Sequence, residues 1–239
     1  MFYKPVILLS ATIKPHPLCI GRTDSKEREE DYYKAVFFYL KQGYPVVFVE
    51  NSDFESERIK NLGRTNSNFE YITFQSKESH LGKSKGEIEI INHALIHSRL
   101  LSQIEYLIKI TGRYIISNID EVLLPTQDIS KDVYINPTRN LRWADTRLIM
   151  MKKSFFHNYF LPTATKYLDE EKHIFMENIF MRSVLHYLIE GGELNLWPVY
   201  PAYQGIDGTH NEKVEFGFFK IWKYNLYYRI KSFIYKHRV

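Results

Sequence analysis

Short apolar runs alternate with helical patterns along the first half of the chain. Each run has the length of one strand and ends in small or polar residues, and a charged or amphipathic segment follows it. The expected strands are 5–12, 45–51, 69–74 and 105–113, and the expected helices are 26–42, 56–62 and 87–98. This alternation predicts a mainly parallel sheet with helices on both faces.

The second half of the chain is less regular. Its expected strands are 132–135, 146–152 and 194–199, with one helix at 175–189. The Asp207-Gly208 pair, within 204–210, predicts a tight turn or an exposed loop. We expect one α/β domain over residues 1–215 and a separate tail over residues 216–239.

Length and composition favour one soluble domain. The chain has 239 residues, 44% of them hydrophobic and 25% charged, enough for one substantial core. Its apolar runs fall short of the roughly 20 residues that a membrane-spanning helix needs. Lys4 and Pro5 interrupt the first of them, so we expect no secretory signal. A single cysteine, Cys19, fits a reducing cytoplasm, and we expect it to serve packing.

The positive charge of the chain is concentrated at its C-terminus. The formal net charge is +4, and six Lys or Arg with no acid follow Glu215, so the chain before them carries −2. In the tail, apolar side chains recur at helical spacing with basic residues between them; they are Phe219, Trp222, Leu226, Ile230 and Phe233. Such a basic amphipathic helix is typical of a membrane-surface anchor. The alternative is a helix packed on the protein's own core.

Polar residues cluster where the predicted strands end. In open α/β sheets, ligands bind outside the carboxyl ends of the strands. Glu50 and Asn51 are therefore candidates to hold a base and ribose, and Ser10, Ala11 and Thr12 offer backbone groups and a hydroxyl. Plain turn chemistry is the competing explanation, since Asn and Ser favour turns without any ligand.

One segment carries a specific resemblance. Residues 106–114, Tyr-Leu-Ile-Lys-Ile-Thr-Gly-Arg-Tyr, resemble the Lys-x-Thr-Gly-Arg-Tyr segment of a group of bacterial capsule and O-antigen glycosyltransferases. In most enzymes of the GT-A fold, an Asp-x-Asp metal motif stands at this place. Three further segments fit the resemblance in the right order: 82–87, 175–180 and 201–210.

The resemblance implies a GT-A-like (Rossmann-like) fold and a function. The function is transfer of a sugar from a nucleotide-sugar donor, UDP-linked, to a glycan acceptor in capsule or lipopolysaccharide O-antigen synthesis. Together with the basic tail, it predicts a cytoplasmic enzyme on the inner face of the membrane, where it would meet a lipid-linked acceptor.

Sugar transfer needs positive charge beside the leaving nucleotide diphosphate. Thr111, Gly112 and Arg113 take the place of the metal-binding carboxylates, and the planar guanidinium of Arg113 suits phosphate oxygens. We expect Arg113 with Lys83 or Lys85 to replace the metal. The alternatives are a salt bridge at a strand end for Arg113 and a solvated loop for the lysines.

We expect no bound cofactor, although Mg2+ or Mn2+ remains an alternative. Asn118 and Asp120 offer the oxygen ligands that these ions prefer. The competing role of Asp120 is that of a helix-capping acid.

Catalytic roles follow from the resemblance. An inverting transferase needs a carboxylate to take the proton of the acceptor hydroxyl, and Glu177 is the candidate by resemblance, with Asp145 as the second. His210, with Thr209, could contact the diphosphate from a loop that closes over the donor. The competing roles are a helix-terminal acid for Glu177 and an exposed loop residue for His210.

Two other functions compete with sugar transfer. A nucleotidyltransferase that makes nucleotide sugars has a related sheet, but a glycine- and arginine-rich loop would follow its first strand, and residues 9–14 contain neither. A binding module for nucleic acid or membranes would show an evenly basic body. The near-neutral body and the polar strand ends of this chain disfavour such a module, and we expect no nucleic acid as a partner.

Overall fold

The central feature of the fold is a seven-stranded, mainly parallel sheet. The computed structural model describes residues 4–16, 21–64, 66–126, 132–208, 210–215 and 217–237, without the side chains of residues 218 and 231–237. The strand order is β10-β6-β9-β4-β1-β2-β3, and β9 is antiparallel to both of its neighbours while the other pairs are parallel. The strands are β1 Ile7–Ala11, β2 Val46–Glu50, β3 Phe69–Thr73, β4 Tyr106–Thr111, β6 Val133–Tyr134, β9 Leu148–Lys152 and β10 Leu194–Asn195.

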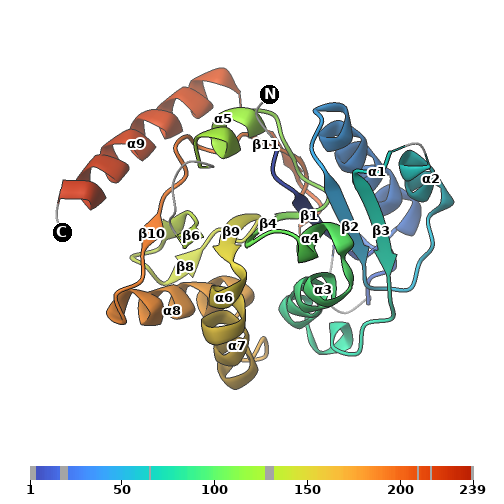
Figure 1. Cartoon of the computed structure of the whole chain (residues 1–239), viewed down its shortest axis with the longest axis horizontal. Helices are drawn as coiled ribbons and strands as arrows, with labels where there is room; N and C mark the ends of the chain where they lie inside the picture. The colour runs from blue at the N-terminus through green and yellow to red at the C-terminus, as the bar shows by residue number, and fades with distance from the viewer. Residues whose placement is uncertain are drawn as a thin grey trace.

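Helices cover both faces of this sheet (Figure 1). One face packs against α1, α2, α5 and α9, and the other against α3, α4, α6, α7 and α8. Their bounds are α1 Ser25–Lys41, α2 Glu57–Lys60, α3 Lys83–His97, α4 Arg99–Ser102, α5 Ile119–Leu123, α6 Lys153–Phe155, α7 Leu161–Tyr167, α8 Met176–Ile189 and α9 Phe218–His237. The α/β class that the alternating pattern predicted is confirmed.

The first strand shows why the pattern folds this way. Successive side chains of a strand point to opposite faces, so a strand buried on both faces is apolar throughout. In β1, Ile7 and Leu9 pack in the core beside Tyr32 of α1, whereas Leu8 packs in the core beside Ile91 of α3. All four of these apolar side chains from the strand and α3 are fully buried.

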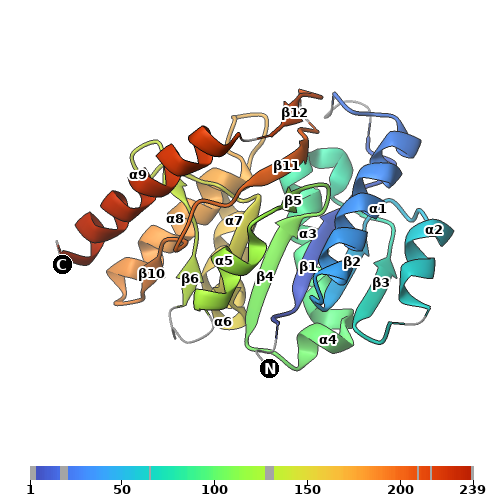
Figure 2. The ribbon, with the colours of Figure 1, turned by 90° about the horizontal axis from the view of Figure 1, so that it is seen from above.

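Two small sheets extend the carboxyl edge of the main sheet. In the first, β5 (Ile115–Ile116), β11 (Tyr203–Ile206) and β12 (Lys213–Val214) pair in the order β12-β11-β5. The second is a hairpin of β7 (Pro137–Thr138) and β8 (Trp143–Ala144). Figure 2 shows β5 and β11 at the ends of β4 and β1, so the small sheet lies beside the region where a ligand of this fold class would bind.

Three expectations about elements need correction. Residues 82–87 were expected as a loop before a helix at 87–98, but α3 begins at Lys83, after Gly82 at φ 142°. The segment 204–210 was expected as a loop or turn, but its first three residues belong to β11. The helix expected at 56–62 divides into α2 and a 3-10 turn, Asn61–Gly63.

Close approach of β1 and β4 explains Gly112. The Gly112 N–H donates to the Ser10 carbonyl, with 2.9 Å between the two atoms. A Cβ at this position would lie 2.6 Å from that carbonyl oxygen and 3.3 Å from Tyr32 Cδ1. Only glycine therefore lets the chain turn beside β1 directly after β4.

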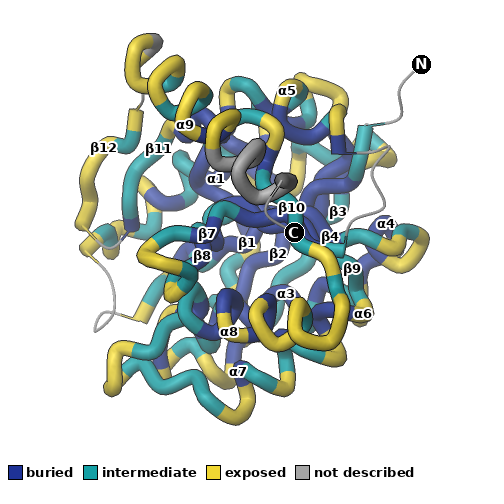
Figure 3. The backbone as a smooth tube through the Cα atoms, turned by 90° about the vertical axis from the view of Figure 1, so that its left-hand side faces the viewer, coloured by how far each residue is buried: buried dark blue, intermediate teal, exposed yellow. Residues whose placement is uncertain are grey.

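The C-terminal tail forms a 20-residue helix, α9. One face packs on the body: Tyr228 is buried, and Asn225 accepts a hydrogen bond of 2.7 Å from the backbone N–H of Tyr200. Exposed positions recur between residues 219 and 230 of the helix (Figure 3). Across the described residues, no helix combines the length and apolar character needed to cross a bilayer.

Candidate active site

A cavity of about 690 Å3 opens at the carboxyl edge of the sheet. Five of the residues proposed from the sequence line it: Lys83, Thr111, Arg113, Asp145 and Glu177. They come from the start of α3, the end of β4, the segment before β9 and the first turn of α8. The fold thus brings together residues that are up to 94 positions apart in the chain.

A smaller cavity of about 50 Å3 adjoins the large one. Ser10, Ala11 and Thr12 line it, as the sequence predicted, together with Arg28, Tyr32 and Gly208. Four residues line both cavities: Lys83, Glu87, Thr111 and Arg113. This group therefore marks the junction between the two spaces.

Glu50 and Asn51 lie outside the walls of both cavities. The Glu50 carboxylate is fully buried and accepts hydrogen bonds from the backbone N–H groups of Ile13, Ser52 and Phe54. The Asn51 side chain accepts from Thr12 Oγ1 at 2.6 Å and donates to the Gly86 carbonyl at 3.2 Å. Both residues hold the loops that shape the small cavity.

Three more candidates lie outside the walls of the large and small cavities: Lys85, His210 and Gly112. Lys85 lines a third cavity, between α3 and α7, on the other side of α3 from Lys83. The exposed His210 ring lies 3.2 Å from Asp207 Oδ1, and it is Asp207 that lines the large cavity. Gly112 acts through the close approach to Ser10 described above. Cys19 and Thr209 lie outside the described residues.

Asp120, the candidate metal ligand, lies outside the cavity walls as well. Its Oδ1 accepts hydrogen bonds from Lys4 Nζ at 2.7 Å and from the Tyr44 hydroxyl at 2.6 Å. Asn118 donates to the Tyr200 carbonyl and accepts from the Ala202 N–H. The described part of the chain contains no group of three His, Cys, Asp or Glu placed to hold a metal ion.

A buried polar network underlies the junction of the two cavities. Lys109, in the middle of β4, forms an ion pair with Glu87 of α3. The Lys109 ammonium also donates to Thr111 Oγ1 at 3.0 Å and to the Thr146 carbonyl at 2.9 Å, and Ser10 Oγ donates to Glu87 at 3.1 Å. Burial acts to raise the pKa of Glu87, but the Lys109 ammonium, together with Lys83 and the Ser10 hydroxyl, holds that pKa below its ordinary value.

Arg113 is a buried cation aimed at the same junction. Its side chain is 8% exposed, and the ring of Tyr114 lies 5.6 Å from its guanidinium carbon. The buried Nε has no hydrogen-bond partner among the described residues. An unpaired buried donor costs about 1–3 kcal/mol, so a guanidinium held in this way is suited to an anion that enters the cavity.

The two candidate bases differ in what surrounds them. Glu177 lies in the first turn of α8 and accepts a hydrogen bond from Thr146 Oγ1 at 3.2 Å. Burial raises the pKa of its carboxyl group above the ordinary value, against smaller effects from Lys83 and Thr146. The Asp145 carboxylate, in contrast, is held by Arg147 through bonds of 2.9 and 2.6 Å. Glu177 is thus the better placed proton acceptor.

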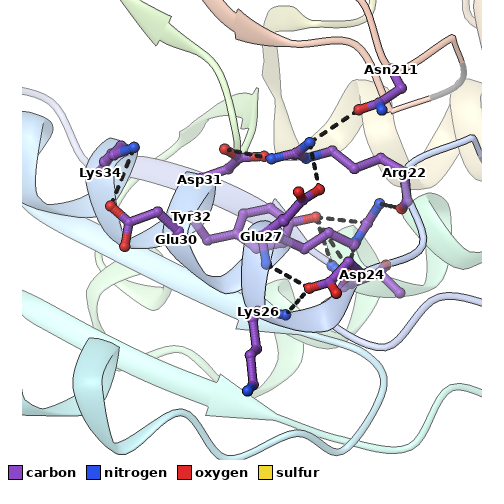
Figure 4. Close-up of polar contacts among 11 residues, drawn as sticks. Arg22, Asp24, Lys26, Glu27, Glu30, Asp31, Tyr32, Lys34 and Asn211 are labelled. Atoms are coloured by element: carbon purple, nitrogen blue, oxygen red, sulfur yellow. Dashed lines mark hydrogen bonds and ion pairs between the residues drawn. The ribbon is translucent and has the colours of Figure 1, made fainter.

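The turn after β11 covers the small cavity and is tied to the loop after β1. The Gly208 carbonyl accepts the N–H groups of Gly21 and Arg22 at 3.1 and 3.2 Å. The Arg22 guanidinium lies between Asp31, at 2.7 Å, and the Asn211 side chain, at 3.0 Å (Figure 4). A Cβ on Gly208 would lie 2.6 Å from Arg113 Cζ, so glycine lets this turn approach the guanidinium.

Several residues of the site were missed from the sequence. Two of them are Glu87 and Lys109, which form an ion pair. Lys109 is the lysine of the Lys-x-Thr-Gly-Arg segment, so the resemblance could have indicated it. Asp207 was read only as part of a turn. Five further missed residues are aromatic and line the large cavity: Trp143, Tyr200, Tyr224, Tyr227 and Tyr228. Three of these belong to the tail, which has no local pattern that assigns it to a cavity.

Comparisons with known proteins give similar solved structures but no family. No family model matches this chain, and no curated protein sequence matches it. A glycosyltransferase involved in glycosylation of the major capsid of PBCV-1 is 9% identical, with 80% of each chain covered and a TM-score of 0.46.

Two other similar structures are named as nucleotidyl transferases. A cytidylyltransferase from Leptospira borgpetersenii is 13% identical, with 90% of this chain and 82% of that chain covered and a TM-score of 0.45. The inositol-1-phosphate CTP transferase from T. maritima is 12% identical, with 81% and 84% covered and a TM-score of 0.44. Identities and TM-scores this low do not identify the function of this chain.

Removal of the Glu177 charge is expected to stabilise the fold at neutral pH. The pKa of the Glu177 carboxyl is higher in the folded chain than in the unfolded chain. As pH rises from the unfolded-state pKa through the folded-state pKa, ionisation of this carboxyl therefore lowers the free energy of unfolding. The Glu177→Gln variant should therefore melt higher than the wild type at pH 7, by a few degrees if about 1 kcal/mol is involved. Below about pH 3, where the wild-type carboxyl is protonated in both states, the difference should vanish. Equal melting curves at pH 7 would contradict the raised pKa.

Proposed function

We propose that this chain is a glycosyltransferase that moves a sugar from a UDP-linked donor to a glycan acceptor. The observation that carries the proposal is the buried guanidinium of Arg113, with an Nε that lacks a partner among the described residues, at one end of a cavity lined also by Glu177. Positive charge suited to a diphosphate and a carboxyl group suited to a proton thus share one cavity.

The donor diphosphate is assigned to the junction of the two cavities. Lys83 is the first residue of α3, and the Ser84 N–H beside it already donates to the Glu170 carboxylate, so the proposed contribution of this helix start is the Lys83 ammonium. Lys83 and Arg113 line both cavities, so their charges face an anion placed between them. Ser10, Ala11 and Thr12 line the small cavity and are proposed to contact the donor nucleotide at the edge of the junction, because a cavity of about 50 Å3 does not enclose a nucleoside.

The transfer step follows from this placement. The acceptor hydroxyl oxygen attacks the anomeric carbon, and Glu177 takes the hydroxyl proton. The bond between the anomeric carbon and the β-phosphate oxygen breaks, and its electron pair leaves on the nucleoside diphosphate. Arg113 and Lys83 stabilise the negative charge that develops on that leaving group. Attack from the side opposite the leaving group inverts the anomeric centre.

The acceptor is proposed to be a growing bacterial surface glycan, of the capsule or O-antigen kind. This part of the proposal rests on the resemblance of residues 82–87, 106–114, 175–180 and 201–210 to transferases of those pathways. The protein would work in the cytoplasm at the inner face of the membrane, where α9 would bring the cavity to a lipid-linked acceptor.

Membrane binding is proposed for the outer face of α9. Phe219 and Trp222 are 84% and 62% exposed, and Leu226 and Ile230 are exposed on the same side. Lys223 and Arg229 are exposed next to them, and the opposite face is held on the body by Tyr228. Apolar and cationic side chains together suit the interface of an anionic bilayer.

The donor site can be tested with a matched pair of lysines. UDP should raise the melting temperature of the wild type, in EDTA as well as in manganese, because it binds only the folded state. Lys83→Met should weaken UDP binding by roughly tenfold through loss of one charge-assisted contact. Lys85→Met, which changes a lysine two residues away that faces another cavity, should leave it unchanged.

The same screen distinguishes the alternatives. Stabilisation by UDP only with manganese would contradict the metal-free diphosphate site. A response to GDP, CMP or TDP in place of UDP would change the donor class, and no response to any nucleotide would contradict the proposed function.

The general base is tested by the transfer rate. Glu177→Gln should lower kcat by about 10²–10⁴-fold while UDP binding is retained, because the amide cannot take a proton. The assay follows UDP release from UDP-glucose and UDP-galactose in the presence of bacterial lipid-linked glycan. Asp145→Asn is the comparison, since Arg147 already holds that carboxylate. A larger loss in Asp145→Asn than in Glu177→Gln would reverse the two roles.

Membrane association is tested by sedimentation with vesicles of phosphatidylglycerol and phosphatidylcholine. The wild type should sediment with them at low salt, and less at high salt, since the attraction is partly electrostatic. Trp222→Glu should reduce binding about tenfold or more, because a charge replaces a side chain that enters the interface. Ile96→Glu, at a position 64% exposed on α3, is the matched control. Equal binding of both variants would contradict the role of α9.

A further inference from the structure

One wall of the large cavity is built by the C-terminal helix. Tyr224, Tyr227 and Tyr228 of α9 line it together with Tyr200, which precedes β11. Trp143 of β8 lines it next to Phe175, just before α8, with 6.2 Å between the ring centres. None of these aromatic residues lines the small cavity, and we call the part of the large cavity that they line its aromatic end, which also contains the ion pair of Arg147 with Asp145.

The aromatic wall is held rigidly. The rings of Tyr200 and Tyr224 stack, with centroids 4.5 Å apart and planes 16° apart, and Tyr228 meets Tyr200 edge-on at 5.5 Å. The Asn225 side chain fixes the Tyr200 backbone. Tyr227, which is 57% exposed, extends this wall towards the opening. Such a wall presents ring faces at little cost in conformational entropy.

A strained turn contributes further residues to the lining of this cavity. Arg139, Asn140 and Leu141, between β7 and β8, have φ angles of 50°, 54° and 61°. The left-handed conformation costs a residue with a side chain roughly 1–2 kcal/mol, and such strain gathers at functional sites. The Arg139 guanidinium lies 4.2 Å from the centre of the Trp143 ring, and Asn140 lines the cavity.

This combination of groups suits a sugar ring. A hexopyranose presents C–H groups on its faces and hydroxyl groups at its edge. The negative face of an aromatic ring attracts polarised C–H groups, and amide and hydroxyl side chains bond to sugar hydroxyls. Arg147 in this region is already paired with Asp145 at 2.6 Å, whereas the proposed diphosphate site has Lys83 and Arg113.

We propose that the aromatic end of the cavity is a subsite for a neutral hexopyranose ring of the acceptor, with Tyr227 of α9 as a specificity-determining residue. The assignment of that sugar as an acceptor rests on the proposed function, whereas the binding of a sugar ring does not. One helix would then contact the acceptor sugar with its inner face and the membrane with its outer face.

The test measures sugar binding without any donor. Saturation-transfer difference NMR on the whole chain uses methyl β-D-glucopyranoside, methyl β-D-galactopyranoside and methyl α-D-mannopyranoside as probes. At least one should receive saturation at its ring C–H protons. Tyr227→Ala should weaken that binding about fivefold, and Tyr227→Phe should restore it, because the ring face makes the contact. Phe37→Ala, which removes a ring 48% exposed on α1, is the matched control.

The outcomes separate this inference from the proposed function. Binding of no probe, or equal binding by Tyr227→Ala and Phe37→Ala, overturns the subsite. If UDP still stabilises the chain in that case, the donor site stands and only the acceptor subsite fails. Sugar binding lost in Tyr227→Ala without any response to UDP supports the subsite and contradicts the proposed transferase.

Discussion

The buried ion pair between Lys109 and Glu87 is the interaction on which the site depends. Two charges inside a protein need each other and further hydrogen bonds, since removal of one partner costs about 3–5 kcal/mol. Here Ser10, Thr111 and the Thr146 carbonyl supply those bonds, so the pair joins β1, β4, α3 and the segment before β9. Loss of the pair would remove the polar contact that joins α3 to β4 beneath the site.

The same network places the residues proposed for chemistry. Thr146, whose carbonyl accepts from Lys109, donates its hydroxyl to Glu177 at 3.2 Å. Glu87 lies one helical turn after Lys83, so the pairing of Glu87 with β4 also fixes the start of α3. A buried charge pair is weak evidence for stability but a strong constraint on geometry. In this chain the Lys109–Glu87 pair fixes the position of Lys83, at the start of α3, relative to the Glu177 carboxyl.

The C-terminal helix links the cavity to the exterior. Its inner side is fixed by Tyr224, Asn225 and Tyr228, and its outer side exposes Phe219 and Trp222. Packing on the protein's own core, one of the two alternatives for the tail, is confirmed for the inner side of α9, and membrane binding of its outer side stays a proposal. Because α9 lines the large cavity on one side and is exposed on the other, contact of its outer side with a surface would place that surface next to the cavity.

The sequence determined the strands of the main sheet, the four longest helices and five residues of the large cavity. Hydrophobic periodicity and strand-end polarity are local signals, so β1, β2, β3 and β4 and the placement of Ser10, Thr111 and Arg113 could be read from them. These local signals also selected Glu50 and Asn51, whose side chains bond to loop backbone and line neither cavity. A polar residue at a strand end can stabilise a loop as well as bind a ligand, and the sequence does not distinguish the two roles.

Only the tertiary structure decided the rest. Helix α3 begins at Lys83, four residues earlier than expected. Successive side chains of a helix are turned by 100°, so Lys83 faces the large cavity and Lys85, two residues later, faces the other side of the helix. The pairing of Glu87 with Lys109, and the packing of Tyr224 and Tyr228 on Tyr200, join residues distant in sequence. No local pattern contains such contacts, because they exist only once the sheet and its helices have packed.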